Sequence, residues 1–312
     1  MSAVGELSQI LSRKKRGGPR EKHPDNKAGL VFMTPWLLGL LGITIIPMVA
    51  SLYLSFTDYS MLAAPEWVGL ENYIDMASDS RLRNSLVVTF TYVLVGTPLQ
   101  LIAALLLAVL LNQGMKGLSF YRSVFYLPSL LGGSVAISIL WRQMFGANGL
   151  VNQFLGALGF TNLPGWVSNP DTALWTIILL HVWTFGSPMI IFLAGLRQIP
   201  QMYYEAASVD GASKVAQFFR ITIPLLTPII FFNLVLQVIN AFQTFTQAFV
   251  VSGGTGGPSD STMFYTLYLY QKGFTQFDMG YASAMAWLLL VIVAIFTAIN
   301  FFVSKFWVHY DD

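Results

Sequence analysis

Few residues of this chain could do chemistry, and they are widely separated. The sequence has no cysteine, and its three histidines, His23, His181 and His309, lie far apart. No Asp or Glu lies within the long apolar stretches described below. The sequence therefore lacks the buried carboxylates that form the proton relays of ion-coupled carriers. We therefore predict no catalytic residue, no metal site and no cofactor bound by this chain.

A glycine-rich segment at Gly253–Gly257 is superficially similar to a nucleotide-binding loop. The phosphate-binding motif G-x-x-x-x-G-K-[ST] needs a lysine after its glycines, and none follows here. We interpret this segment as a hinge in an external loop. Energy for any driven process must then come from another subunit.

Polar and aromatic side chains inside the apolar stretches are the candidates for contact with a cargo. A polar molecule that crosses a membrane needs hydrogen-bond partners and flat apolar surfaces. The candidates are His181, Trp183, Thr184, Asn233, Gln237, Asn240, Gln243 and Thr244. Of these, Gln237, Asn240 and Thr244 share one helical face. The alternative, that such groups bond neighbouring helices, stays open for each residue and is the preferred interpretation of His181.

The elements that must position these residues are membrane-spanning helices. The sequence is 55% hydrophobic and 10% charged, whereas charged residues make up about a quarter of a soluble protein. An apolar run of about 18 or more residues can cross a hydrocarbon core of about 30 Å as a helix. We predict an all-α membrane protein with six transmembrane helices at about 29–56, 85–111, 120–141, 172–196, 221–250 and 281–304.

A seventh stretch without charge runs from Gln143 to Pro170. Its many glycine and asparagine residues and Pro164 would break a helix, and lipid would leave irregular backbone groups without partners. We predict an interfacial loop in this region.

The distribution of positive charge predicts the orientation, because Lys and Arg stay on the cytoplasmic side of short loops. With the N-terminus inside, all but four of the 17 Lys and Arg residues are cytoplasmic. The four outside are Arg81, Arg83, Arg142 and Lys272. We therefore predict that both ends of the chain are cytoplasmic.

This topology defines the organisation of the chain. We predict a basic cytoplasmic tail at 1–28, a transmembrane domain at 29–306 and a cytoplasmic C-tail at 307–312. Within the domain, 197–220 is a cytoplasmic loop and 251–280 an external loop. The polar, basic start is not expected to be a cleaved signal peptide. The lack of cysteine leaves the compartment open.

The loop between the fourth and fifth spans has the most ordered pattern. It reads IPQMYYEAASVDGAS from Ile199 to Ser213. Met202–Val209 suits a short helix, and Gly211 permits a turn with positive φ. Ser213 can cap a second helix, and Pro224 suits the first turn of the fifth span. We predict two short helices that meet at Gly211.

Glu-Ala-Ala, then Asp-Gly-Ala, then Ile-x-x-Pro resembles the cytoplasmic signature of permease subunits of binding-protein-dependent ABC importers. The resemblance implies a type I ABC importer permease fold, in which Glu205 meets basic groups in a cleft of the ATPase and Gly211 sets the angle between the helices. An amphipathic interfacial helix is the alternative, and it does not explain the whole ordered string. The residues assigned to ATPase coupling are Glu205, Ala206, Ala207, Asp210 and Gly211.

Further strings resemble the carbohydrate branch of this family, the longer permease of maltose-, trehalose- and glycerol-3-phosphate-type importers. They include Tyr53–Tyr59, Gly69–Tyr73, Gly149–Asn152, Ala194–Pro200 and Gly280–Ala284. Similarity to the maltose-type permease implies cargo contacts on the third, fourth and fifth spans. Together with the polar side chains above, the predicted cargo path is Ser129, Gly133, His181, Trp183, Thr184, Gly186, Gln237, Asn240, Ala241 and Thr244.

The resemblance implies a non-catalytic subunit that moves a sugar, such as a di- or oligosaccharide of the trehalose or maltose type, across a bacterial or archaeal cytoplasmic membrane. ATP and Mg²⁺ would be used by the partner ATPase. The implied partners are a second permease, two ATP-binding subunits, an external solute-binding protein and the lipid bilayer, with no nucleic acid. A glycerol-3-phosphate or polyol importer is an alternative. A channel subunit would leave the ordered loop without a purpose, and a carrier or membrane enzyme would need groups that the sequence lacks.

Overall fold

The computed structural model describes residues 25–114 and 117–309. Nearly all of the predicted basic tail and the last residues of the C-tail therefore lie outside the described residues. The chain divides into two compact units, Met1–Ser51 and Leu52–Asp312.

The first unit holds a single long helix. It consists of α2 (Asp25–Gly39), the π-helical turn η1 (Leu40–Ile45) and the beginning of α3 (Ile46–Leu54). From Val31 to Leu54 this helix is long and apolar enough to cross a membrane, and most of its apolar side chains are exposed. Its composition therefore suits contact with lipid along its length.

The second unit is almost entirely helical. Its two short strands, β1 (Thr57–Asp58) and β2 (Glu66–Trp67), pair antiparallel. Its other elements are α4 (Glu71–Ser78), α5 (Ser80–Thr91), η2 (Tyr92–Gly96), α6 (Thr97–Leu111), α7 (Leu118–Leu131), α8 (Val135–Met144), α9 (Leu150–Ala157), α10 (Pro170–Trp183), α11 (Gly186–Leu196), α12 (Gln201–Val209), α13 (Lys214–Gln217), η3 (Phe218–Thr222), α14 (Ile223–Phe242), α15 (Thr246–Ser252), η4 (Pro258–Asp260), α16 (Tyr265–Tyr270), η5 (Gln271–Thr275) and α17 (Met279–Ser304).

Among the described residues, four helices could cross a membrane by length and composition, or up to six if two bent pairs each count as one span. The third predicted span, 120–141, is one of these pairs and is not one continuous helix. Its halves, α7 and α8, meet at 94°. The bend falls at Gly132 and Gly133, and Ser134 begins α8 by accepting a hydrogen bond from the N–H of Ile137. The fourth span, α10 with α11, bends by 41°.

The fifth predicted span ends earlier than expected. We predicted a helix to about Val250, but α14 ends at Phe242 and the chain turns before α15. The break is stabilised because the hydroxyl of Thr266 donates to the carbonyl oxygen of Thr244, which the helix no longer uses. The sequence of Gln243–Phe245 has no Gly or Pro to signal this turn.

The stretch from Gln143 to Pro170 is more ordered than the predicted loop, because it contains the eight-residue helix α9. Asn152 holds the surrounding chain together. Its Nδ2 donates to the carbonyl oxygens of Ala147 and Pro164, and its Oδ1 accepts from Nε1 of Trp166. One amide therefore satisfies backbone groups on both sides of the helix.

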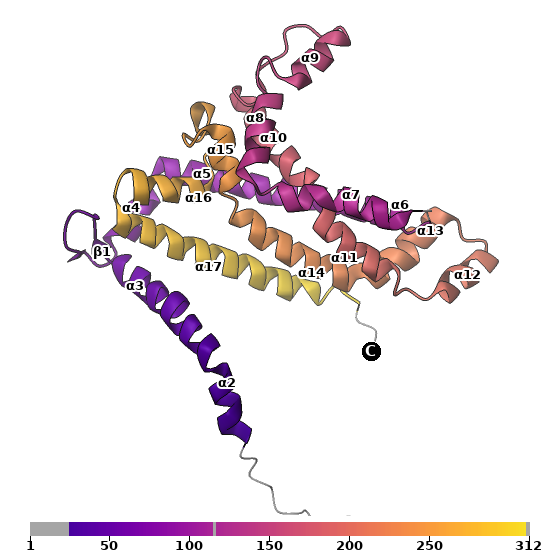
Figure 1. Cartoon of the computed structure of the whole chain (residues 1–312), viewed down its shortest axis with the longest axis horizontal. Helices are drawn as coiled ribbons and strands as arrows, with labels where there is room; N and C mark the ends of the chain where they lie inside the picture. The colour runs from indigo at the N-terminus through magenta and orange to yellow at the C-terminus, as the bar shows by residue number, and fades with distance from the viewer. Residues whose placement is uncertain (1–24, 115–116, 310–312) are drawn as a thin grey trace, which may run out of the picture. The chain divides into compact units, whose positions relative to one another are not determined.

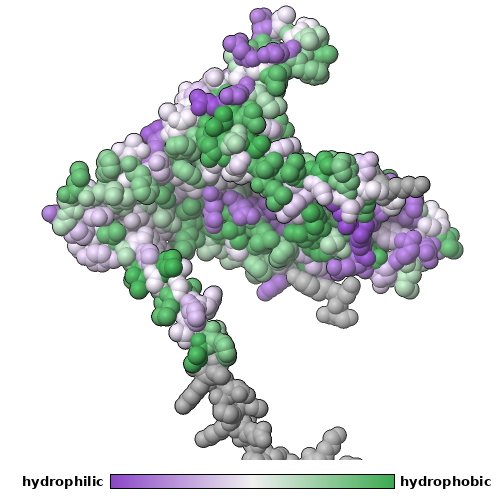
Figure 2. Space-filling model, in the orientation of Figure 1, coloured by the Kyte–Doolittle hydropathy of each residue, from purple (hydrophilic) through white to green (hydrophobic). Residues whose placement is uncertain are grey.

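The core of the second unit lies in two apolar clusters. One is built around Tyr92, Ile177, Phe242 and Tyr265, and the other joins α6, α11 and α14. Figure 1 shows α14 running beside α17, and α12 and α13 together at one end of this unit. Figure 2 shows hydrophobic surface along these long helices and more hydrophilic surface near α12 and α13.

Candidate functional site

The loop 197–220 folds largely as its sequence predicts. α12 covers the predicted first helix, and Gly211 has a φ of +77°, the left-handed conformation that favours glycine. Ser213 caps α13 by accepting from the N–H of Ala216. The predicted turn and cap are therefore both confirmed.

The second helix of this loop differs from the prediction because it does not end before the fifth span. α13, the π-helical turn η3 and α14 run continuously from Lys214 to Phe242. Pro224 lies in the first turn of α14, as predicted, although α14 continues directly from η3. The wide turn at Phe218–Thr222 precedes this proline, which has no N–H to donate.

Two pairs of side chains tie α12 to this long helix. The hydroxyl groups of Tyr204 and Thr222 lie 2.9 Å apart. Nε2 of Gln217 donates to Oγ of Ser208 at 2.9 Å and to the carbonyl oxygen of Ala212 at 3.1 Å. Gln217 is only 4% exposed. A displacement of α12 would therefore pull directly on the helix that continues into the fifth span.

The predicted coupling residues lie on the outer side of this loop. Glu205, Ala206, Asp210 and Gly211 are exposed, and Ala207 is partly buried. None of the residues of α12 is buried, and Met202 and Val209 are among its exposed apolar side chains. Among the described residues, Glu205 forms no ion pair. The loop thus presents an unpaired carboxylate beside apolar groups, a surface suited to a protein partner.

A cavity of about 310 Å³ lies between the second, third, fourth and fifth predicted spans. It contains every predicted cargo-path residue except Trp183, Gly186 and Ala241. Its lining side chains, as the structure describes them, include no Lys, Arg, Asp or Glu. The lining is Tyr92, Gln100, Ser129, Gly133, His181, Thr184, Ser187, Pro188, Gln237, Asn240, Thr244 and Gln247.

The three residues outside the cavity lining have packing roles. The ring of Trp183 lies 5.9 Å from that of Trp141. Ala241 is fully buried in the core. A Cβ on Gly186 would come within 2.6 Å of the carbonyl oxygen of Phe125, so only glycine lets α11 approach α7 this closely.

The hydroxyl groups of the lining already have partners within the protein. Oγ of Ser129 donates to the carbonyl oxygen of Thr184 at 2.8 Å and accepts from the N–H of Ser187 at 2.8 Å. Oγ1 of Thr184 donates to the carbonyl oxygen of His181 at 2.7 Å. These bonds satisfy backbone groups freed at the bend between α10 and α11. Ser129 and Thr184 therefore hold the broken helix together.

The amides of the fifth span are different. Among the described residues, the side chains of Gln237 and Asn240 have no hydrogen-bond partner, although both line the cavity. The sequence left open whether these amides face a cargo or bond a neighbouring helix. In this structure they bond no helix, which leaves them available to a molecule in the cavity.

Sequence reasoning missed the contribution of the second span, which is Tyr92 and Gln100. Gln100 is the only amide in the predicted span 85–111. The rule that selected polar residues in the fourth and fifth spans would have found it there too. Tyr92 had no comparable signal, because aromatic side chains are frequent throughout this chain.

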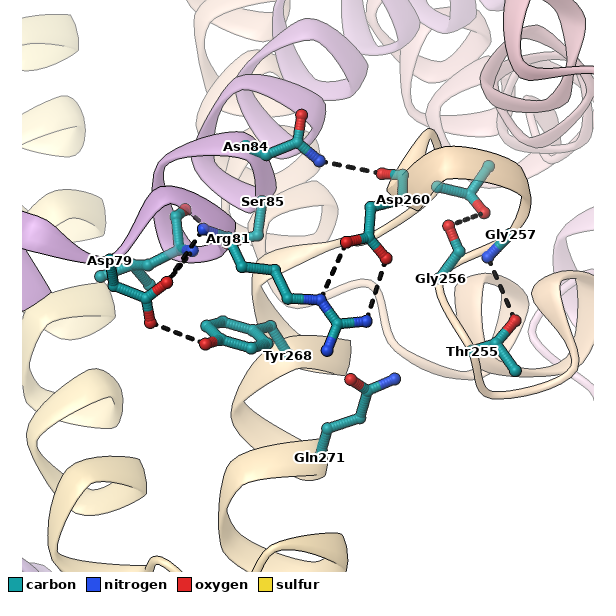
Figure 3. Close-up of polar contacts among 12 residues, drawn as sticks. Asp79, Arg81, Asn84, Ser85, Thr255, Gly256, Gly257, Asp260, Tyr268 and Gln271 are labelled. Carbon is teal, nitrogen blue, oxygen red and sulfur yellow. Dashed lines mark hydrogen bonds and ion pairs between the residues drawn. The ribbon is translucent and has the colours of Figure 1, made fainter.

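A second polar cluster holds the turn after α15 against the start of α5 (Figure 3). Arg81 donates from Nε and Nη2 to the carboxylate of Asp260 at 2.9 and 3.0 Å. Nδ2 of Asn84 donates to the backbone carbonyl oxygen of Asp260, whose φ of +56° is unusual for a residue with a side chain. Gly253, Gly254, Gly256 and Gly257 also have positive φ. The glycine segment is thus part of a turn that hydrogen bonds from Arg81 and Asn84 to Asp260 hold against α5.

Asp79 joins three elements of the same cluster. Its carboxylate accepts from the hydroxyls of Tyr268 at 2.6 Å and Tyr281 at 2.7 Å, and from the N–H groups of Arg81 and Leu82. Partial burial acts against ionisation, but these hydrogen bonds outweigh it and hold the pKa of Asp79 below its usual value of 3.8. The cluster is therefore most stable with Asp79 ionised.

Comparison with known proteins identifies the family. Residues 74–308 match the family described as "Binding-protein-dependent transport system inner membrane component". The chain belongs to this family. The permease is 56% identical to the probable ABC transporter permease protein YesP of Bacillus subtilis, over 94% of this chain and 95% of that protein. It is 32% identical to the trehalose/maltose transport system permease protein MalF of Thermococcus litoralis, over 91% and 96% of the two chains.

A solved structure shows the same fold. The permease matches a chain of a bacterial alginate ABC transporter, crystallised in complex with its alginate pentasaccharide-bound periplasmic protein, with a TM-score of 0.75. The match covers 90% of this chain and 96% of that chain at 20% identity. The permease thus has the type I ABC importer permease fold, and the family resemblance drawn from its loop is confirmed.

Proposed function

We propose that this permease moves a di- or oligosaccharide across a bacterial or archaeal cytoplasmic membrane, driven by ATP hydrolysis in partner subunits. It would do so as one of two different permeases, with two ATP-binding subunits and an external solute-binding protein. The carbohydrate class is supported by relatives with sugar-transport names, of which the Thermococcus litoralis protein is one. The six-span topology with cytoplasmic ends belongs to this proposal.

The loop 197–220 is the observation on which the proposal depends. It presents Glu205, which has no ion pair within the described part of the chain, on an exposed helix, and side-chain hydrogen bonds fasten that helix to the fifth span. In this assignment the loop is the docking site of an ATPase. Movement of the ATPase would reach the cavity through α14, on which Gln237 and Asn240 lie.

The cavity supports a sugar over glycerol-3-phosphate. A phosphate group is normally held by Arg or Lys, and no described side chain that lines the cavity is charged. The lining instead offers amides, an imidazole and the tyrosine ring of Tyr92. Amides that can both donate and accept suit the hydroxyl groups of a sugar.

Co-purification tests the proposal against a channel subunit that needs no ATPase. The tagged permease should bring down a second permease and an ATP-binding subunit from detergent-solubilised membranes. The complex should contain two ATP-binding subunits for each pair of permeases. A matched Glu205→Lys variant should insert normally and bring down less of the ATP-binding subunit, because the reversed charge weakens docking. Recovery of the inserted wild-type permease without any ATP-binding subunit would remove the proposed coupling role.

A further inference from the structure

The second span supplies a buried amide to the cavity. Gln100 is 2% exposed and lines the cavity from α6. Its Nε2 donates to the carbonyl oxygen of Thr184 at 3.1 Å and to Oγ1 of Thr184 at 2.9 Å. Both hydrogens of the amide are therefore used within the protein.

The surrounding bonds fix which way this amide points. The carbonyl oxygen of Thr184 can only accept, and Oγ1 of Thr184 gives its own hydrogen to the carbonyl oxygen of His181. A flipped amide would place its oxygen against two acceptors and lose both bonds. Nε2 of Gln100 must face Thr184, and Oε1 must face away from it.

Oε1 of Gln100 is buried and has no hydrogen-bond partner among the described residues, and neither has Nε2 of His181. His181 lies on the same wall of the cavity. Its Cδ2 is 3.1 Å from the position of a Cβ on Gly96, one helical turn before Gln100. A buried polar atom without a partner is costly, so two of them on one wall indicate a ligand that satisfies both.

We propose that Gln100 and His181 form a hydroxyl-binding subsite for the cargo on the wall between the second and fourth spans. Oε1 of Gln100 accepts a hydrogen bond from a sugar hydroxyl, and Nε2 of His181 bonds the same hydroxyl or its neighbour. The free amides of Gln237 and Asn240 bind the sugar from the fifth span. This subsite rests on the proposed function, because its ligand is the transported sugar.

The subsite should act as a specificity determinant. Its amide is held rigidly by Thr184, so it cannot turn to offer a donor in place of its acceptor. A site built to bond a hydroxyl strongly rejects an analogue that lacks it, because the buried acceptor then has no partner. Replacing the relevant hydroxyl by hydrogen should therefore weaken transport more than replacing any other.

The test uses the complete importer in liposomes, with external binding protein and internal ATP. Uptake of maltose, trehalose and lactose is measured first, and then uptake of each monodeoxy form of the best sugar. Gln100→Met should lower transport efficiency for the parent sugar by about five- to hundredfold. It should cause no further loss with the deoxy form that lacks the bonded hydroxyl. Ser129→Ala is the matched control, because it weakens the same helix bend and should reduce uptake of all forms by one common factor.

If Gln100→Met lowers transport efficiency equally for the parent sugar and all deoxy forms, or not at all, Gln100 only joins helices and the subsite is overturned. The proposed function would still stand. If Gln100→Met does not assemble, His181→Phe takes its place in the same comparison, with the same selective loss expected. Failure of the wild-type importer to move any of the three sugars would remove the sugar class and the subsite with it.

Discussion

At the scale of single residues, the cavity separates side chains that hold the protein from side chains that are free. The hydroxyls of Ser129 and Thr184 donate hydrogen bonds to backbone carbonyl oxygens at a helix bend. The side-chain amides of Gln237 and Asn240 line the same cavity and have no hydrogen-bond partner among the described residues. The sequence predicted all four as cargo contacts, because residue type and helical spacing do not reveal which bonds are already made. Only the bend between α10 and α11 explains the difference.

The free amides give the first prediction. Replacing Gln237 and Asn240 together by Leu should depress uptake about five- to hundredfold, because a sugar hydroxyl loses a partner worth about 1–3 kcal/mol. Assembly and basal ATPase activity should stay near wild-type values. Sugar uptake by liposomes of known subunit stoichiometry is the measurement. Loss of assembly before loss of transport would instead mean that these amides join helices.

Asp79 gives a prediction about pH. Its folded pKa is lowered, so its stabilising effect is complete above pH 3.8 and is lost as the pH falls through the folded pKa. Tyr268→Phe removes the hydrogen bond of 2.6 Å and should raise this pKa. The melting temperature of the variant should therefore lie below that of wild type at pH 7, and the two should converge at low pH. Tyr270→Phe is the control, and a difference that stays constant down to pH 3 would contradict this role of Asp79.

At the scale of elements, helices were easier to predict than their bends. The apolar runs marked the long helices, and the Gly211 turn and Ser213 cap were readable because each depends on one residue. The 94° bend between α7 and α8 has local signals at Gly132 and Gly133, but its contacts and those at the early end of α14 also involve distant groups. Gln247 of α15 donates to the carbonyl oxygen of Gly132 at the bend between α7 and α8. The hydroxyl of Thr266 donates to the carbonyl oxygen of Thr244 after the end of α14. No local pattern contains those contacts.

Glycine packing at the bends gives the next prediction. Gly186→Ala should lower stability by about 1–3 kcal/mol, because the new Cβ would meet the backbone of α7 at Phe125 and Tyr126. Gly133→Ala is the matched control, since nothing lies within 4 Å of its Cβ position. Thermal unfolding in detergent compares the two variants. Equal melting temperatures would show that α7 yields easily at this contact.

The loop 197–220 gives the prediction for coupling. Glu205→Lys should leave the permease inserted and folded, because Glu205 is exposed and has no ion pair among the described residues. Uptake should fall while ATP hydrolysis no longer responds to cargo, since the reversed charge would face basic groups of the ATPase. Glu66→Lys, an exposed residue on β2, serves as the control. Wild-type uptake in the Glu205 variant would exclude the docking assignment.

At the scale of the whole molecule, composition and charge distribution predicted a multi-pass helical membrane protein, and the family and fold are confirmed. The sequence could not show that Tyr92 of the second span lines the cavity, because the cavity wall is formed by helices distant along the chain. It also could not show that Gln217 and Tyr204 fasten the loop to the fifth span. The proposed mechanism depends on both of these long-range arrangements.

If the proposed function is right, this permease moves sugar only when an ATPase drives it. The most direct measurement is uptake of labelled sugar by liposomes that contain the complete importer, with ATP inside and binding protein outside each varied independently. Sugar should accumulate against a gradient when both are present. It should not accumulate when either is omitted or when ATP is replaced by a non-hydrolysable analogue. Equal entry of sugar without ATP would contradict the proposed function and identify a channel.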